Sequence, residues 1–185
     1  EVFMKRPAFD DLLDHTWDIL TNIVTTKTAL RTMTLATVDH DDQPQACLVV
    51  LRAVDRNNQV LEFYTDADSL KCQSLARNSK AQILVWYDRS AVQLRLSVEV
   101  LLRQDKKAAE RWQKVPSLSQ VSYGKQPATG TVIVGPFDYK ALASEEKFVV
   151  GECQITKIDY LSLKEDHFRV QFEKKFGWSG KWISP

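Results

Sequence analysis

The stretch around Ser69 contains the residue types that best fit a chemical task. A strand-like segment ends at Thr65, and Ser69 is then placed to cap a helix that carries Lys71 in its first turn. The free N–H groups at the start of a helix, a hydroxyl and an ammonium can together bind a phosphate, because they supply oriented donors and positive charge. Taken alone, Ser-x-Lys at a helix start is common, and most such corners hold only water. The segment therefore predicts an anion site and leaves a solvated corner as the alternative.

The strands before this corner are expected to bring Arg52 close to it. If Asp55 and Asn58 close a two-residue hairpin, residues whose numbers sum to 113 face each other, which places Cys47 opposite Asp66. A basic group, a strand with a free edge for a planar ligand and a helix start would then converge. The alternative for Arg52 is an ordinary solvated position on a strand.

The elements that would position these residues follow from the hydrophobic pattern. Apolar residues at three- and four-residue spacing predict a helix over 9–24, and further helices are expected over 69–78 and 105–115. Residues 116–146 show no regular pattern. Segments rich in Val, Leu, Thr and aromatic residues between turn residues predict strands over 32–38, 45–54, 59–65, 81–88, 91–103, 148–160, 168–172 and 178–183. Short connections predict antiparallel neighbours, and apolar residues in both phases indicate a sheet covered on both faces.

Composition narrows the class of protein. The chain has 185 residues, 44% of them hydrophobic and 26% charged, which fits one globular domain and excludes wholesale disorder. A net charge of +1 argues against a protein that binds nucleic-acid phosphates. No apolar run approaches the roughly 20 residues that span a bilayer, so no membrane partner is expected. Three scattered cysteines predict no disulfide framework and no metal site, and they favour the cytoplasm.

Several motifs resemble, in order and spacing, pyridoxamine 5′-phosphate oxidase and its broader relatives, the FMN-binding split barrels. The resemblance covers about residue 30 to the end, on residues 49–55, 63–65, 69–71, 75–78, 86–87, 93–96, 159–163, 167–169 and 182–185. It implies a mainly β (α+β) fold, an antiparallel split β-barrel with flanking helices. Residues 1–185 would form a single domain, with the helix of residues 1–29 packed on the barrel. The family also implies a homodimer that holds FMN at the subunit interface.

The resemblance implies a set of cofactor-binding residues: Val49, Val50, Leu51, Arg52, Tyr64, Thr65, Ser69, Lys71, Gln93 and Arg169. The backbone of residues 49–51 would lie along the flavin ring, and Gln93 would hydrogen-bond the ring. Tyr64 and Thr65 would line the ribityl and phosphate end, and Ser69 and Lys71 would hold the phosphate. Arg169 would reach across from the partner subunit, and Arg52 stands where the oxidase has a substrate-contacting lysine. The implied function is an FMN-dependent oxidoreductase that acts on an unidentified small molecule, with no catalytic residue assigned.

This chain departs from the oxidase pattern at positions that matter for the cofactor. Cys47 and Leu70 stand where the oxidase has phosphate-binding arginines, and Leu161 replaces an aromatic residue beside the flavin. A charge-assisted hydrogen bond contributes roughly 1.5–3 kcal/mol, so two lost cations would weaken FMN binding by an order of magnitude or more. The alternative function is therefore a non-catalytic flavin-binding or apo split-barrel dimer. A haem-binding split barrel is a third, weaker hypothesis.

Overall fold

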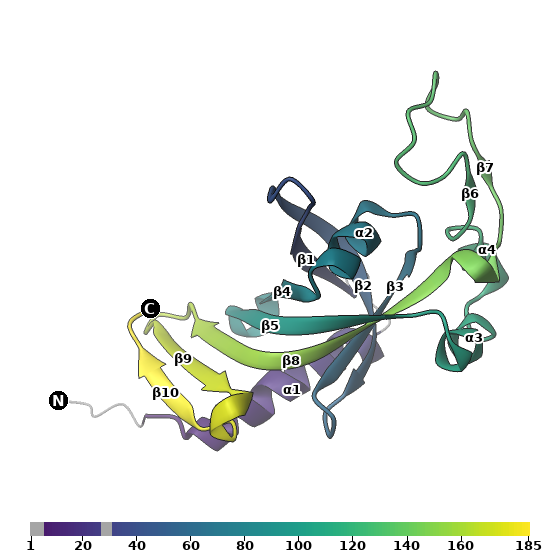
Figure 1. The fold of residues 1–185 in the computed structure, drawn as a ribbon. Helices are drawn as coiled ribbons and strands as arrows, with labels where there is room; N and C mark the ends of the chain where they lie inside the picture. Colours follow the sequence, from purple (N-terminus) through teal and green to yellow (C-terminus); the bar gives the residue numbers. More distant parts are fainter. Residues whose placement is uncertain (1–5, 27–30) are drawn as a thin grey trace.

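The computed structural model describes residues 6–26 and 31–185 (Figure 1). Its strands are β1 (Thr32–Val38), β2 (Pro44–Asp55), β3 (Val60–Asp66), β4 (Lys80–Tyr87), β5 (Val92–Arg103), β6 (Lys125–Gln126), β7 (Lys140–Ala141), β8 (Phe148–Ser162), β9 (Phe168–Glu173) and β10 (Gly180–Ile183). Its helices are α1 (Phe9–Thr25), α2 (Leu70–Arg77), α3 (Lys106–Trp112) and α4 (Ser117–Gln120), with short 3₁₀ turns η1 (Asp88–Ser90), η2 (Glu145–Lys147) and η3 (Lys174–Phe176). None of the helices in these ranges is long and apolar enough to span a membrane.

The sheet closes into a six-stranded antiparallel barrel, which confirms the predicted fold class. Its strands follow the order β8–β3–β2–β1–β4–β5, and β5 pairs back with β8. The long strand β8 makes this closure possible because it pairs with three strands along its length. Its first half pairs with β3 and β5, and its second half pairs with β5 and β9, so that β9 and β10 extend beyond the barrel.

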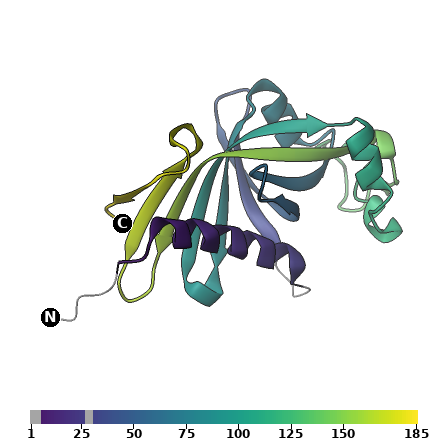
Figure 2. The ribbon, with the colours of Figure 1, turned by 90° about the horizontal axis from the view of Figure 1, so that it is seen from below.

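The core lies inside the barrel and beneath α1. Residues directly paired across five strands, from β1 to β9, all point inward and are at most 1% exposed: Leu35, Ile83, Leu96, Ile158 and Phe172. Helix α1 contributes Trp17, Ile19 and Leu20 to the same cluster and lies along one side of the strands (Figure 2). Its apolar residues fall on the face predicted from their spacing. Burial of a large aliphatic side chain stabilises a fold by roughly 1.5–3 kcal/mol, so this cluster is a main source of stability.

The hairpin between β2 and β3 differs from the expected register. Asp55 pairs with Val60, and the turn between them has four residues, because the Asp55 carboxylate accepts hydrogen bonds from both the backbone and the side chain of Asn58. Gln59 takes a left-handed conformation with φ of +54° to complete the turn. A bulge between Leu51 and Ala53 shifts the register once more.

The prediction that Cys47 faces Asp66 is therefore wrong. Cys47 pairs with Leu35 of β1, and its side chain packs against the core cluster. Asp66 pairs with Phe148 of β8 on the other side of β3. Because the turn is longer than two residues and the bulge adds a further residue, the two positions are not brought together by strand pairing.

One face of the sheet is open to solvent, which differs from the prediction of a sheet covered on both faces. We call this surface the outer face, and it consists of two rows of paired residues: Leu48, Thr34, Leu84, Arg95, Asp159, Gln171 and Lys181, then Trp86, Gln93, Leu161, Arg169 and Ile183. Leu48 is 68% exposed and Trp86 is 52% exposed. The apolar residues of this face led to the prediction that both faces are covered. No segment of the described part of the chain packs over them.

Residues 116–146, which carried no clear pattern, contain α4 and a hairpin-like extension. We call residues 125–141, from β6 to β7, the arm; it projects away from the barrel at the upper right of Figure 1. Its base lies beside α3 and α4. Only two residue pairs hold its strands together, so most of the arm is irregular chain.

Candidate functional site

The barrel is split between β2 and β3, beside the predicted anion site. The two strands pair only from Leu51–Phe63 to Asp55–Val60. On the N-terminal side of Leu51, β2 pairs only with β1. On the C-terminal side of Phe63, β3 pairs only with β8. In the described residues no strand pairing joins these two diverging stretches, so the backbone of Val49 and Val50 has a free edge. The structure thus contains the open strand edge that the sequence predicted.

Thr65, Ser69 and Lys71 converge at the end of β3, and we call these three residues the anion corner. The Thr65 and Ser69 hydroxyl oxygens lie 3.2 Å apart, and Lys71 Nζ lies 3.4 Å from Thr65 Oγ1. Ser69 is the N-cap of α2, but its side chain makes no capping hydrogen bond. Its hydroxyl therefore points to Thr65, and the first N–H groups of α2 are not satisfied by their own N-cap side chain.

The carboxylates next to the anion corner are engaged elsewhere. Asp66 accepts hydrogen bonds from the backbone N–H of Gly124, at 2.7 Å, and of Asp68, at 2.8 Å. Asp68 forms an ion pair with Lys147 at 2.8 Å. Neither carboxylate forms an ion pair with Lys71 in the part of the chain that the structure describes. The corner therefore combines two hydroxyls, a helix start and one cation, which is a donor set suited to a phosphate.

Arg52 lies on the bulge of β2 and stacks on the ring of Tyr64. Its guanidinium carbon is 5.3 Å from the ring centroid, and its Nε is buried without a hydrogen-bond partner in the described residues. Burial raises the pKa of Tyr64 and of the neighbouring Tyr123, and the positive charge of Arg52 opposes this rise at both. Tyr64 also packs edge-on against Phe148 at 5.0 Å. The result is an aromatic wall with a buried, unsatisfied donor.

Gln93 and Arg169 belong to the outer face and do not meet the anion corner in this chain. On β8, Thr65 is opposite Val149, whereas Gln93 is opposite Leu161. These positions are twelve residues apart, about 40 Å along the strand. Leu161 separates Gln93 from Arg169, so the two polar side chains lie in one row with two strand spacings between them.

Asp159 holds Arg169 in place. Its carboxylate accepts two hydrogen bonds from the Arg169 guanidinium, both at 2.8 Å, and one each from Arg95 and Gln171. Burial alone would raise the pKa of Asp159, but these hydrogen bonds outweigh it and lower the pKa to about 2. Asp159 therefore stays charged at neutral pH and orients Arg169 on the outer face.

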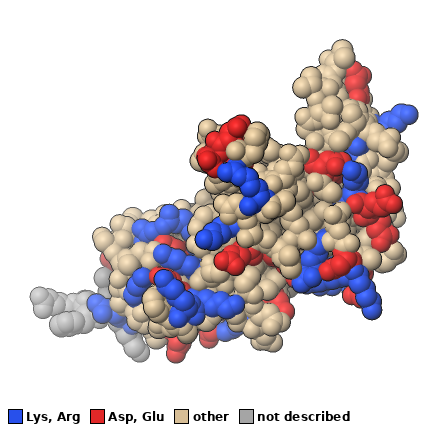
Figure 3. Space-filling model, viewed as in Figure 1, with Lys and Arg blue, Asp and Glu red and all other residues tan. Residues whose placement is uncertain are grey.

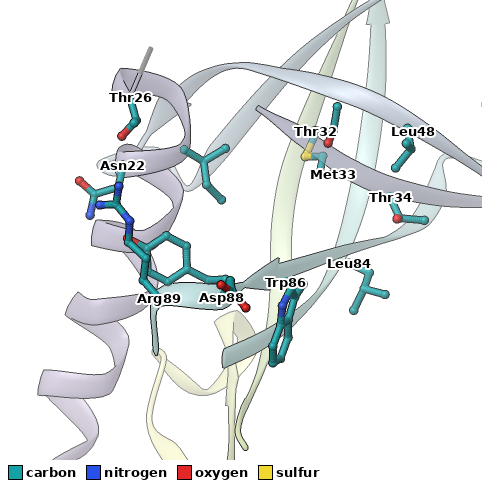
Figure 4. Close-up of a pocket in the computed structure, with 12 residues that line it drawn as sticks. Asn22, Thr26, Thr32, Met33, Thr34, Leu48, Leu84, Trp86, Asp88 and Arg89 are labelled. Carbon is teal, nitrogen blue, oxygen red and sulfur yellow. The ribbon is translucent and has the colours of Figure 1, made fainter. Parts of the chain in front are cut away.

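A pocket of about 490 Å³ hollows the outer face where β1 and β4 lie next to the end of α1. Leu84 and Trp86 of β4 and Leu48 of β2 line it, and Asn22 of α1 and Arg89 of η1 close one side (Figure 4). Half of its lining side chains are apolar or aromatic, and none belongs to the anion corner. The pocket fits a large apolar group better than a charged one.

One group of potential metal ligands also gathers among the described residues. Asp39, His40 and Asp41 lie within 4.8 Å of one another in the turn between β1 and β2. Asp39 already accepts hydrogen bonds from the backbone of Asp41 and Gln43 and from the Gln45 side chain. These contacts give the carboxylate a role in shaping the turn.

Sequence reasoning missed three contributors to the site: Asp159, Tyr123 and Gly124. Asp159 was part of a family motif, but nothing local in the sequence marks it as the partner of Arg169. Gly124 has φ of +112°, and a Cβ atom there would lie 2.7 Å from Leu142 O. A lone glycine in an irregular stretch could have suggested such a tight crossing, although not its contact with Asp66.

A family model matches the part of the chain that contains the anion corner. Residues 14–104 match the model described as pyridoxamine 5′-phosphate oxidase, FMN-binding domain. The pyridoxine/pyridoxamine 5′-phosphate oxidase of Psychrobacter arcticus is 35% identical over 101 residues, 54% of this chain and 46% of that protein. The enzyme of the same name from Acaryochloris marina is 26% identical over 83% of this chain and 61% of that protein. The matched chain thus spans about half to two thirds of the length of these curated relatives.

Solved structures resemble the whole described fold. A pyridoxamine 5′-phosphate oxidase-related, FMN binding protein from Nostoc punctiforme has a TM-score of 0.74 at 21% identity, covering 98% of this chain and 100% of that one. PhzG from Burkholderia lata, solved with tetrahydrophenazine-1-carboxylic acid, has a TM-score of 0.77 at 16% identity, covering 100% of this chain and 99% of that one. At these identities the likeness concerns the fold. Together with the family model and the relatives, it identifies the chain as a divergent relative of pyridoxamine 5′-phosphate oxidase with the fold of the FMN-binding split barrels.

Proposed function

We propose that this protein is an FMN-binding homodimer and an FMN-dependent oxidoreductase related to pyridoxamine 5′-phosphate oxidase, acting on a small molecule that is not identified. The observation that carries the proposal is the anion corner at the mouth of the split between β2 and β3. It lies within the residues that match the FMN-binding domain model. The cytoplasm, which the three free cysteines favour, is the proposed compartment.

The residues present fit the phosphate end of FMN. Lys71 supplies a charge, Ser69 and Thr65 supply hydroxyls, and the start of α2 supplies N–H groups. The free backbone edge of Val49 and Val50 offers hydrogen-bonding groups to a planar ring next to this corner. A free phosphate would use only the anion corner.

The homodimer follows from the positions of Gln93 and Arg169. Both project from the outer face, about 40 Å along β8 from the anion corner. If they contact the same flavin, they must come from a second copy of the chain. In that arrangement the part of the outer face that carries Gln93 and Arg169 lies against the split of the other copy.

Bound FMN would supply the electron-accepting chemistry, as flavins do in oxidoreductases. The protein's task is to bind and orient. Lys71 and Ser69 fix the phosphate, the β2 edge aligns the ring, and Asp159 keeps Arg169 ionised and extended. Arg52 places a positive charge and an unpaired N–H at the aromatic wall, where they can bind a negatively charged substrate group.

The second candidate is a flavin-binding or apo split-barrel dimer without catalysis. A specific observation favours it: the corner retains one cation, while Leu70 points into solvent at 46% exposure and Cys47 packs against the core. With one charge-assisted bond in place of three, the corner binds phosphate more weakly by roughly 1.5–3 kcal/mol for each lost bond. Steady turnover of any reductant and acceptor pair by the FMN-loaded protein would exclude this candidate.

The test compares FMN with riboflavin, which lacks the phosphate. We expect purified wild-type protein to quench the fluorescence of added FMN on binding, and Lys71→Ala to weaken FMN binding by at least about tenfold, the equivalent of roughly 1.4 kcal/mol. Riboflavin binding should not change, because Lys71 contacts only the phosphate in this proposal. Lys114→Ala, an exposed lysine at the end of α3, is the matched control.

Two results would contradict the proposal. Protein that stays colourless after FMN addition and desalting, and that does not quench FMN, would exclude FMN binding. Equal losses of FMN and riboflavin in Lys71→Ala would mean that Lys71 supports the fold or the ring site and not the phosphate.

A further inference from the structure

The arm exposes apolar side chains that nothing in the described part of the chain covers. Val132 is 95% exposed, Val134 101% and Phe137 85%, and Tyr139 is also open at 42%. The projecting part of the arm is mainly tan in Figure 3, where it stands clear of the barrel. We infer that the arm docks on a second copy of this chain, on the outer face around Leu48, Leu84 and Trp86. This inference rests on the homodimer proposed above and adds the element that fastens it.

The base of the arm is fixed, so the arm has a defined direction. Gly124 donates its N–H to the buried Asp66 carboxylate at 2.7 Å, and Ser144 N–H donates to Tyr123 O at 2.9 Å. The two legs cross so closely at Gly124 that a Cβ atom there would meet Leu142 O and Ser144 Cβ at 2.7 Å. These contacts fix the base of the arm, and from this base the arm extends away from its own barrel (Figure 1).

The outer face is a suitable receptor for the arm. Its pocket of about 490 Å³ opens between α1, β1 and β4 and is lined by Leu48, Leu84 and Trp86 (Figure 4). Trp86 of the pocket is paired with Gln93, in the row of the outer face that also holds Arg169, and the proposed function places both polar residues at the contact between copies. In a two-fold dimer the arm of each copy contacts the outer face of the other, so the dimer contains two equivalent arm-to-face contacts.

The area available is that of a stable dimer. From the exposures of the arm and face side chains, docking both arms would remove roughly 700 Å² per copy from water, close to the ~800 Å² per partner of a standard interface. Neither surface alone reaches this area. A monomer would leave both exposed, which soluble single chains rarely do with patches of this size.

The experiment measures the dimer by light scattering and sedimentation across a dilution series. We expect Phe137→Asp to raise the dimer dissociation constant by at least about tenfold, because it places a charge in the proposed apolar pocket. Phe176→Asp, at a residue 60% exposed on η3 and outside both surfaces, is the matched control. Since both residues lie outside the core, circular dichroism should show unchanged folds.

A cross-link tests the contact itself. In a Cys47→Ala background, Val134→Cys chains are mixed with Leu84→Cys chains, and oxidation should give a disulfide-linked dimer that contains one of each. A dimer that persists in Phe137→Asp and forms no mixed disulfide would overturn the arm inference and leave the dimer standing. A wild-type chain that is monomeric at high concentration would overturn the arm and the dimer together. The FMN and riboflavin titrations report on cofactor binding separately in either case.

Discussion

Asp159→Asn tests the electrostatic organisation of the outer face. The Asp159 carboxylate is 4% exposed and accepts hydrogen bonds from Arg169, Arg95 and Gln171. Burial opposes its ionisation, but these three partners together lower its pKa from 3.8 to about 2. That fall in pKa corresponds to about 2 kcal/mol of folding stability at neutral pH.

The sign of the pH dependence follows from the direction of the shift. Because the pKa is lower in the folded than in the unfolded chain, this stability is present above about pH 4 and is lost as the pH falls toward about 2. Asparagine keeps the shape of the side chain and removes its charge. We therefore expect Asp159→Asn to lower the free energy of unfolding by about 2 kcal/mol at neutral pH and by about half as much near pH 3.

Urea unfolding followed by tryptophan fluorescence, at one protein concentration, measures both values. Asp166→Asn, in the exposed turn between β8 and β9, is the control for loss of a carboxylate. A loss of stability that is the same at both pH values, or no larger than that of the control, would refute the assignment of Asp159 as the charged anchor of Arg169.

Two further predictions concern buried groups away from the anion corner. Glu62, 5% exposed on β3, accepts two hydrogen bonds from Arg111 of α3, so Glu62→Gln should cost about 3 kcal/mol in urea unfolding; a cost below about 1 kcal/mol would contradict a buried ion pair. A thiol reagent should modify the partly exposed Cys47 quickly, while Cys72 and Cys153, whose pKa values are raised by burial, react only in urea. Two or more fast thiols in the native protein would count against the described core.

The secondary structure could be predicted from the sequence because the signals that determine it are local. Strand β1 spans the residues predicted for it, and α2 lies between the predicted caps Ser69 and Asn78. Turn residues and caps act over three or four positions, and the alternation of buried and exposed residues fixes the strands between them. The anion corner was predictable for the same reason, since Thr65, Ser69 and Lys71 lie within seven residues of one another.

The register of the hairpin between β2 and β3 could not be predicted, although its turn residues were identified. Asp55 and Asn58 do interact, but as part of a four-residue turn completed by the left-handed Gln59. The bulge near Arg52 then shifts the pairing again. Turn composition restricts turn length without fixing it, and each added residue displaces every cross-strand partner.

Contacts between distant segments left no signal in the sequence. Asp66 meets Gly124 across 58 positions, and Arg95 meets Asp159 across 64. The open outer face was misread for a related reason. Its apolar residues indicated a covered face, but a single sequence does not say whether such a cover comes from a helix of the same chain or from another molecule.

The weak anion corner and the unpartnered outer face are best understood together. One cation at the corner supplies roughly 1.5–3 kcal/mol, so FMN must obtain much of its binding free energy from the ring site, to which the second copy contributes Gln93 and Arg169 in the proposed dimer. Each ligand that binds only the assembled site then stabilises the assembly by the same free energy that the assembly adds to its binding. A family member with an intact set of phosphate arginines could retain FMN through the corner alone. In the proposed dimer, the loss of those arginines would transfer the control of FMN retention to the contact between copies, and the arm would set the strength of that contact.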